Sequence, residues 1–307
     1  MILAALLVLV LLATGGVCAQ GPLLPVELQR LAGAYLDSGD QVDRDRLLAY
    51  VRKSASRETK GLARFALGMG DHKAENHAQA AEELKKAAAE MAELADYAQY
   101  YQARSLAAAE KFGEAAGLLA GFERSFAESR LVPGAGRLRA ESLIRSEQRD
   151  QARKILEAEK SPVAKPVRLW LLGRIEELDG KPLRAVRTYR QAYYKYPLSP
   201  QAEEAEKRLD ILRRKLGERY PPAPSSWRLG RADVLFRASK YPQAGAEYRR
   251  ALAGLKASDR DRAEVRIGAS DYRRLHTSAA YSRLSRLKVE DPKADAERLY
   301  YLGECAR

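Results

Sequence analysis

Small and aromatic residues recur at fixed steps along the stretch that begins at Gly173. Ala185 follows after twelve residues, and Tyr189, Ala192 and Pro197 come next at steps of four, three and five. These steps place small and aromatic side chains on the facing sides of two short helices, with a proline after the second helix. The pattern therefore predicts a helical hairpin in which small residues let the two helices approach closely and an aromatic ring fills the groove between units.

The same step recurs through the chain, and we call the small residue that opens each step the anchor of its hairpin. Successive anchors are separated by 35, 35, 37, 33, 59, 36 and 35 residues. All but one of these separations lie close to the 34 residues of a tetratricopeptide repeat, whose order of residue types the pattern matches. The anchors are Gly33, Gly68, Ala103, Ala140, Gly173, Ala232, Gly268 and Gly303.

Most second helices follow the pattern, with a small residue twelve positions after the anchor and a larger one sixteen positions after it. The first unit departs from it, because Asp45 stands where a small residue is expected, as is common in terminal repeats. No segment shows the two-residue alternation of a strand. We predict an all-α protein whose tetratricopeptide-like helical-hairpin repeats are stacked into a curved solenoid. Gly68 and Gly70 are interpreted as a helix-turn pair rather than a nucleotide-binding loop.

The one long separation, 59 residues, leaves room for an extra helix, which we expect over 201–219. Prolines over 220–226 then break regular structure, and a second, shorter break lies over 161–166. The predicted organisation is a first repeat segment over 20–200, an extra helix and proline-rich joint over 201–226, and a second repeat segment over 227–307 that ends within a repeat.

The first thirteen residues form an uninterrupted apolar run that is too short to span a membrane but is typical of a signal peptide. Small residues follow, and Val17, Cys18 and Ala19 fit a cleavage site after Ala19. We predict a signal peptide over 1–19 and a periplasmic or secreted protein that leaves the membrane after cleavage. Two alternatives are lipidation at Cys18 after cleavage before it, and an uncleaved membrane anchor.

The chain carries 54 Lys and Arg against 41 Asp and Glu, a net charge of +13. A basic surface favours anionic partners, namely nucleic acid, lipid headgroups or anionic wall polymers. The alternative is that the charge only solvates helix faces. Export would separate the protein from nucleic acid, so we expect no nucleic-acid partner.

The sequence offers no catalytic set, and we predict no catalytic, cofactor-binding or metal-binding residue. Cys18 and Cys305 cannot form a disulfide framework or a cysteine zinc site, and His72 and His77 are poorly spaced for one metal. Phosphate-loop, zinc-protease and serine-hydrolase motifs are absent. Carboxylates come as neighbours on helices and point about 100° apart, unlike a glycosidase pair. These neighbours are Glu82–Glu83, Glu176–Glu177 and Glu203–Glu204.

Tyrosine is abundant, with 16 residues, several of them in runs. We interpret most of them, with Trp170 and Trp227, as packing between repeats, and a minority as platforms that stack on sugars beside Arg and Lys. The runs are Tyr97 with Tyr100–Tyr101, Tyr193–Tyr194 with Tyr196, and Tyr300–Tyr301.

Three segments resemble the N-terminal helical region of soluble lytic murein transglycosylases: 96–101, 193–202 and 294–307. The resemblance covers nearly all of the chain after residue 19. It implies an exported α-superhelix that precedes a lysozyme-like domain, in which the Glu of a Glu-Ser motif cleaves peptidoglycan to a 1,6-anhydro product. This sequence departs from the family, because Glu128–Ser129 and Glu141–Ser142 lie in repeat helices and lack the Gly-Leu-Met-Gln-type segment that follows. We transfer no catalytic role to either glutamate.

The resulting hypothesis is an exported helical-repeat scaffold that binds or positions peptidoglycan for a lytic transglycosylase and is itself non-catalytic. The partner would be peptidoglycan or a downstream catalytic domain of a full-length enzyme. The alternative is an envelope tetratricopeptide adaptor that binds a protein partner. Repeat arrays offer extended surfaces, which suit either role better than a deep catalytic pocket does.

Overall fold

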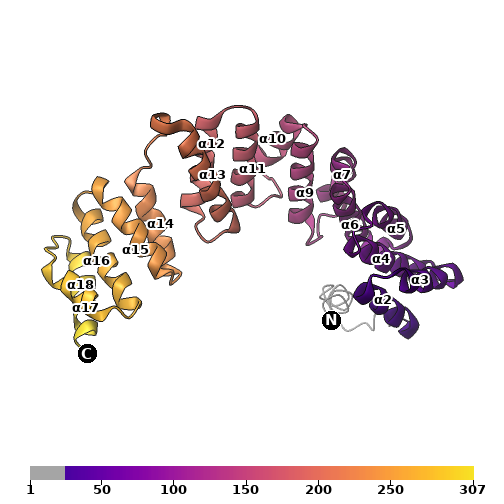
Figure 1. The fold of residues 1–307 in the computed structure, drawn as a ribbon, viewed down its shortest axis with the longest axis horizontal. Helices are drawn as coiled ribbons and strands as arrows, with labels where there is room; N and C mark the ends of the chain where they lie inside the picture. Colours follow the sequence, from indigo (N-terminus) through magenta and orange to yellow (C-terminus); the bar gives the residue numbers. More distant parts are fainter. Residues whose placement is uncertain (1–24) are drawn as a thin grey trace. The chain divides into compact units, whose positions relative to one another are not determined.

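The computed structural model describes residues 25–307, and every regular element in that range is a helix (Figure 1). This confirms the predicted all-α fold. The predicted signal peptide over 1–19, with Cys18 and Ala19, lies outside the described residues. Among the described helices, none is long and apolar enough to cross a membrane.

The helices alternate between those that carry an anchor and those that pack back on them. Anchors lie in α2 (Val26–Ser38), α4 (Arg57–Lys73), α6 (Ala95–Ala108), α9 (Val132–Arg145), α11 (Lys165–Leu178), α14 (Ser225–Arg237), α16 (Ala257–Arg273) and α18 (Pro292–Ala306). Second helices are α3 (Gln41–Lys53), α5 (His77–Glu90), α7 (Phe112–Leu118) with the short α8 (Phe122–Ser125), α10 (Arg149–Glu157), α12 (Pro182–Lys195), α15 (Tyr241–Ala251) and α17 (Thr277–Arg286). Short 3₁₀ turns lie at Ala92–Leu94, Gly217–Arg219 and Leu252–Gly254.

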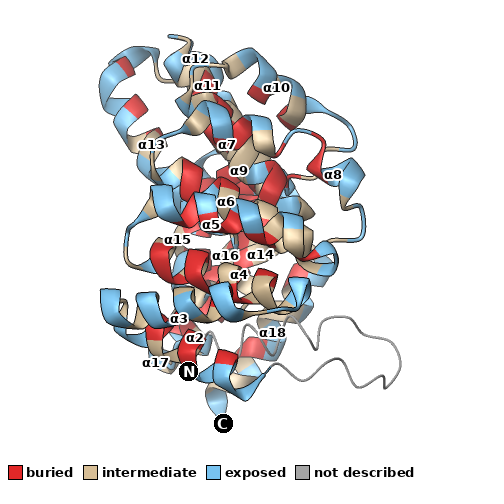
Figure 2. Cartoon of the chain, turned by 90° about the vertical axis from the view of Figure 1, so that its right-hand side faces the viewer, coloured by how far each residue is buried: buried red, intermediate tan, exposed pale blue. Residues whose placement is uncertain are grey.

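The anchor lies at the closest approach of the two helices in each hairpin from α4–α5 onward. A Cβ on Gly68, Gly173 or Gly268 would lie 2.5 to 2.6 Å from a side-chain atom of the residue sixteen positions later. Those later positions are fully buried in six hairpins, as are the alanines twelve positions after each anchor (Figure 2). The predicted step pattern is therefore confirmed as the contact between paired helices. The buried residues at the sixteenth position are Leu84, Leu119, Leu156, Tyr189, Tyr248 and Leu284.

One turn geometry joins the two helices in these six hairpins. The residue seven positions after the anchor has a positive φ, between 60° and 70°, although only one of the six is glycine. The following backbone N–H donates to the carbonyl oxygen five residues earlier, as Lys181 does to Glu176 at 2.8 Å. This is the hydrogen bond of a Schellman helix end, which satisfies carbonyls that the helix leaves unpaired. The residues with positive φ are Glu75, Glu110, Glu147, Gly180, Ser239 and Leu275.

The first hairpin is built differently, as the misfit of Asp45 indicated. Asp45 is exposed, and a Cβ on Gly33 would meet no atom within 4 Å. Tyr35 of α2 instead packs on Gly70, where a Cβ would lie 2.3 Å from the ring. The interpretation of Gly68 and Gly70 as a turn is wrong, since both lie inside α4 and give close approach to side chains on two sides.

The described chain forms two compact units that divide between Ala164 and Lys165, at the shorter of the two predicted breaks. Within each unit, consecutive hairpins pack on one another: α5 contacts α6, α15 contacts α16, and α16 contacts α18. The curved solenoid concerns the whole array and stays a prediction.

The extra helix forms as α13 (Pro200–Leu216) and belongs to the second unit. It packs on α11 and α12, while α14 packs directly on α12. The proline-rich segment is also held in place. Arg190 donates to the carbonyl oxygens of Pro221 and Pro222, and Tyr220 lies between the guanidinium groups of Arg190 and Arg213. Ser225 and Ser226, placed in the joint by sequence, already belong to α14, which starts directly after Pro224.

Candidate functional site

Three buried tyrosines organise the charged side chains of the molecule. In the first unit, the Tyr35 hydroxyl donates to Asp71 at 2.6 Å, and Arg44 pairs with the same carboxylate at 2.7 Å. Asp71 has no exposed side-chain surface. Burial and the Asp71 carboxylate raise the pKa of Tyr35 well above its usual value, so the phenol stays protonated and donating. The triad ties α2, α3 and α4 together.

The α11–α12 hairpin repeats this arrangement. Tyr189 donates to Glu177 at 2.8 Å, and Arg208 of α13 donates to both oxygens of Glu177 at 2.6 and 2.9 Å. Burial acts to raise the pKa of Glu177, but the hydrogen bonds from Arg208 and Tyr189 outweigh it and hold that pKa below its usual range. The triad therefore connects the hairpin to the extra helix.

The α14–α15 hairpin contains the third triad. Tyr248 donates to Asp233 at 2.7 Å, and Arg266 of α16 donates to the same carboxylate at 2.7 Å. Arg266 also pairs with Glu297 of α18 at 3.4 Å. Three first helices, α14, α16 and α18, are thus joined in one ladder. The polar atoms of these triads are bonded to one another, so we interpret the triads as structural.

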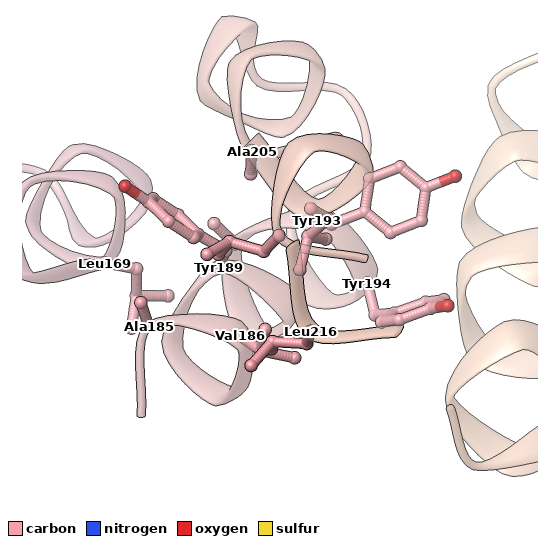
Figure 3. Packing of buried hydrophobic residues seen from close by; sticks show 11 residues of the cluster. Leu169, Ala185, Val186, Tyr189, Tyr193, Tyr194, Ala205 and Leu216 are labelled. Atoms are coloured by element: carbon pink, nitrogen blue, oxygen red, sulfur yellow. The ribbon is translucent and has the colours of Figure 1, made fainter. Parts of the chain in front are cut away.

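A fourth charged cluster lies beneath the proline-rich segment. Glu247 of α15 is 3% exposed, accepts from Tyr193 at 3.0 Å and pairs with Arg250 at 3.1 Å. Tyr193 and Tyr189 point to opposite sides of α12, toward α14–α15 and α11 respectively (Figure 3). The Arg231 guanidinium stacks on the Tyr193 ring at 3.6 Å and donates to the Tyr193 carbonyl oxygen. This cluster joins α12 to the next hairpin.

The adjacent carboxylates considered in the sequence are spread over separate surfaces or taken up by ion pairs. Glu83 pairs with Arg64 at 2.7 Å and with Lys86 at 2.9 Å. Although burial opposes it, the net effect of these partners is to lower the pKa of Glu83. A general acid for glycoside cleavage needs a raised pKa. Neither Glu83 nor Glu177 meets that requirement.

The Glu-Ser pairs are likewise engaged within the helices and turns. Glu141 pairs with Arg137 at 2.8 Å, and Ser142 is buried inside α9. Glu128 is exposed, while Ser129 donates to Asp96 at 2.5 Å. These contacts agree with assigning neither glutamate a catalytic role.

His72 and His77 lie together where α4 turns into α5. Their ring centroids are 5.1 Å apart, and His72 Nδ1 lies 3.0 Å from Ser105 Oγ. Burial, followed by the charge of Arg104, lowers the pKa of His72. His72 therefore stays neutral at pH 7 and joins α4 to α6 through Ser105.

One surface of the first unit combines partly exposed rings with exposed cations, and we call it the Tyr100–Arg104 surface. It consists of Tyr100, Tyr101 and Arg104 on α6 with Arg137 on α9. The two tyrosine rings meet edge to face at 5.4 Å, and the Arg104 guanidinium lies 5.3 Å from the Tyr101 ring centroid.

Local packing sets the position of this surface. Gly134 of α9 lets the Tyr100 hydroxyl approach, since a Cβ there would lie 3.2 Å from it. Burial raises the pKa of Tyr100, so its phenol stays neutral. Within the described residues, no carboxylate pairs with Arg104. Phenol rings and guanidinium groups at one surface can stack on sugar rings and bind carboxylates.

The other tyrosine runs mainly pack, as the sequence predicted for most of them. Tyr193 and Tyr194 are buried in the core of the second unit, and Tyr301 is buried against α16. Tyr300 is the exception in its run, with 55% of its surface exposed. Trp170 and Trp227 are partly buried against the same core as Tyr193.

The sequence analysis missed an ion pair that recurs in register. Residues four before and fifteen after the anchor carry opposite charges in three hairpins and face each other in the structure. The pairs are Arg64 with Glu83, Arg228 with Glu247, and Glu264 with Arg283. Reading charge at these two positions of each unit would have found them.

Comparison with protein-family models and with curated protein sequences gave no match. The resemblance to the helical region of lytic transglycosylases thus stays a prediction that rests on the segments quoted above.

Proposed function

We propose that the protein is an exported helical-repeat scaffold that binds peptidoglycan and positions it for a lytic transglycosylase. The observation that carries the proposal is the Tyr100–Arg104 surface, where partly exposed phenol rings lie beside cations on neighbouring first helices. Glycan strands present sugar rings for stacking, and peptide stems present carboxylates for arginine. Non-catalytic binding fits the low pKa of Glu83 and Glu177, whose charges are fixed by ion pairs.

Electrostatics supports an anionic ligand. The chain carries a net charge of +13, and Arg104 has an exposed guanidinium. An electrostatic share of binding is screened by salt, because the Debye length falls to about 8 Å at physiological ionic strength. Binding to peptidoglycan should therefore weaken as salt is raised.

The test is co-sedimentation of the purified protein with insoluble peptidoglycan at several salt concentrations. Replacing Tyr100 by Ser and Arg104 by Gln together should lower the bound fraction at least fivefold. Arg187→Gln is the matched control, because Arg187 is exposed on α12 in the other unit. Equal binding by the double variant and the control would overturn the assignment of the surface. Absence of sedimentation by the unchanged protein would overturn the proposed ligand and favour the protein-adaptor alternative.

A further inference from the structure

Helix α18 exposes an apolar face that other hairpins cover. Its register matches that of α11, with Leu299 and Gly303 in place of Leu169 and Gly173. In α11, Leu169 is 6% exposed and Gly173 lies against the ring of Tyr189 from α12. In α18, Leu299 is 55% exposed, and a Cβ on Gly303 would meet no atom within 4 Å. The same surface is thus formed twice and covered once.

The open face extends into a depression beside α17. In the α4–α7 region, Leu106 contacts both Ala81 of the preceding second helix and Ala115 of its own. The residues in register with Leu106 and Ala81 are Ala306 and Tyr281. These two residues, with Thr277, Ser278 and Cys305, line a cavity of about 370 Å³ where the counterpart of Ala115 would lie. Tyr281 is 49% exposed.

The exposed face of α18 also carries the signature of the helix that would cover it. Second helices α12 and α15 present an alanine and, four residues later, a tyrosine, as in Ala185 and Tyr189. Ala296 and Tyr300 repeat this spacing on the exposed side of α18. One helix therefore presents both the glycine that receives a tyrosine and a tyrosine for such a glycine.

We propose that two copies of this chain associate through an antiparallel pair of α18 helices related by a twofold axis. Tyr300 of each copy would pack on Gly303 of the partner subunit, so one contact generates the other, as in any isologous interface. Ala296 would then face the end of the partner helix that bears Ala306 and the cavity beside Tyr281. The pairing continues the contact that α12 makes with α11 and does not depend on peptidoglycan binding.

Charge distribution permits this pairing. The exposed stripe from Ala296 through Leu299 and Tyr300 to Gly303 carries no ionisable group other than the tyrosine. Its acidic neighbours are already paired within the helix, Asp295 with Arg298 at 2.7 Å and Glu304 with Arg307 at 3.0 Å. One helix face covers less than the roughly 800 Å² per partner of a standard interface. The dimer should therefore form and dissociate with protein concentration.

Sedimentation velocity over a hundredfold range of protein concentration tests the proposal. The expected result is a monomer–dimer equilibrium that Tyr300→Ser and Gly303→Arg each shift at least tenfold toward monomer. Open space at Gly303 lets the monomer accept the arginine, which circular dichroism checks. Leu183→Ser is the matched control, since Leu183 is 52% exposed on α12 and should leave the equilibrium unchanged.

Cross-linking then tests the geometry, with Cys18 and Cys305 replaced by Ser. A mixture of Tyr300→Cys and Gly303→Cys proteins should form a mixed disulfide faster than either protein alone forms its own. A monomer at every concentration would overturn the proposal. So would a dimer that both variants leave intact, or cross-linking without preference for the mixed pair.

Discussion

At the crossing of α11 and α12, a Cβ on Gly173 would lie 2.5 Å from the ring of Tyr189. The ring is fully buried, and its hydroxyl is held by Glu177 at 2.8 Å, so it has little freedom to move aside. Overpacking a rigid core site typically costs about 1 to 3 kcal/mol. The anchor is thus a steric requirement at this hairpin, whereas helix propensity alone would favour alanine.

We predict that Gly173→Ala lowers the free energy of unfolding by about 1 to 3 kcal/mol, measured by urea denaturation. The matched control is Gly230→Ala in α14, where a Cβ would meet nothing within 4 Å. There the loss of glycine's backbone entropy should instead stabilise the protein by about 0.5 to 1 kcal/mol. A stabilising effect at both positions would show that Tyr189 can yield and that the anchor is not restrictive.

At the scale of helices, the Tyr189–Glu177–Arg208 triad joins α11, α12 and α13 through one carboxylate. The pKa of Glu177 is lowered in the folded state, so its ionised form stabilises the fold. That contribution is present above the unfolded pKa, near 4.5, and is lost as pH falls through the lower folded value. The acid side of the stability profile should therefore depend on this residue.

We predict that Glu177→Gln lowers the free energy of unfolding at pH 7 by about 1 to 3 kcal/mol, the range for hydrogen bonds to charged groups. The difference from the unchanged protein should shrink as pH falls below about 4.5, because protonation then removes the same charge. Denaturation at several pH values between 3 and 7 measures this. Glu204→Gln is the control, since Glu204 is exposed and pairs only with Lys207. A difference constant across pH would contradict the role given to the carboxylate.

Sequence predicted the helix pairs because the contact between two helices fixes residue size at known steps. Gly68 and Leu84 could be paired on that basis, and the structure confirms the pairing. The first hairpin could not be predicted, because Tyr35 packs on Gly70 of the next hairpin instead of within its own. The triads were also missed, since the partner of Tyr189 includes Arg208 of a helix outside the repeat pattern.

For the candidate site, sequence could name aromatic runs but could not separate exposed from buried rings. Tyr100 and Tyr193 both belong to such runs and share no obvious difference in sequence. Exposure depends on which neighbouring helix covers the ring: Gly134 lies against Tyr100, whereas Arg231 stacks on Tyr193. Such cover comes from the packing of successive hairpins, which the step pattern within one hairpin does not specify.

At the scale of the whole molecule, the apolar core is divided between the two units. Clusters in the first unit include those around Leu47, around Met91 and around Phe122, and those in the second include clusters around Tyr189 and Tyr248. Each of these clusters draws all its residues from one side of the division between Ala164 and Lys165. Each unit therefore has a core of its own, as an independently folding domain requires.

We predict that residues 25–164 and 165–307, produced separately, each fold to a helical protein with a cooperative thermal transition in circular dichroism. The control divides the second unit at the proline-rich segment, into 165–222 and 223–307. That cut separates Trp227 and Ala223 from the Tyr193 core, so these fragments should melt without cooperativity. Cooperative folding of the control fragments, or failure of 25–164 and 165–307 to fold, would place the true boundary at the prolines instead.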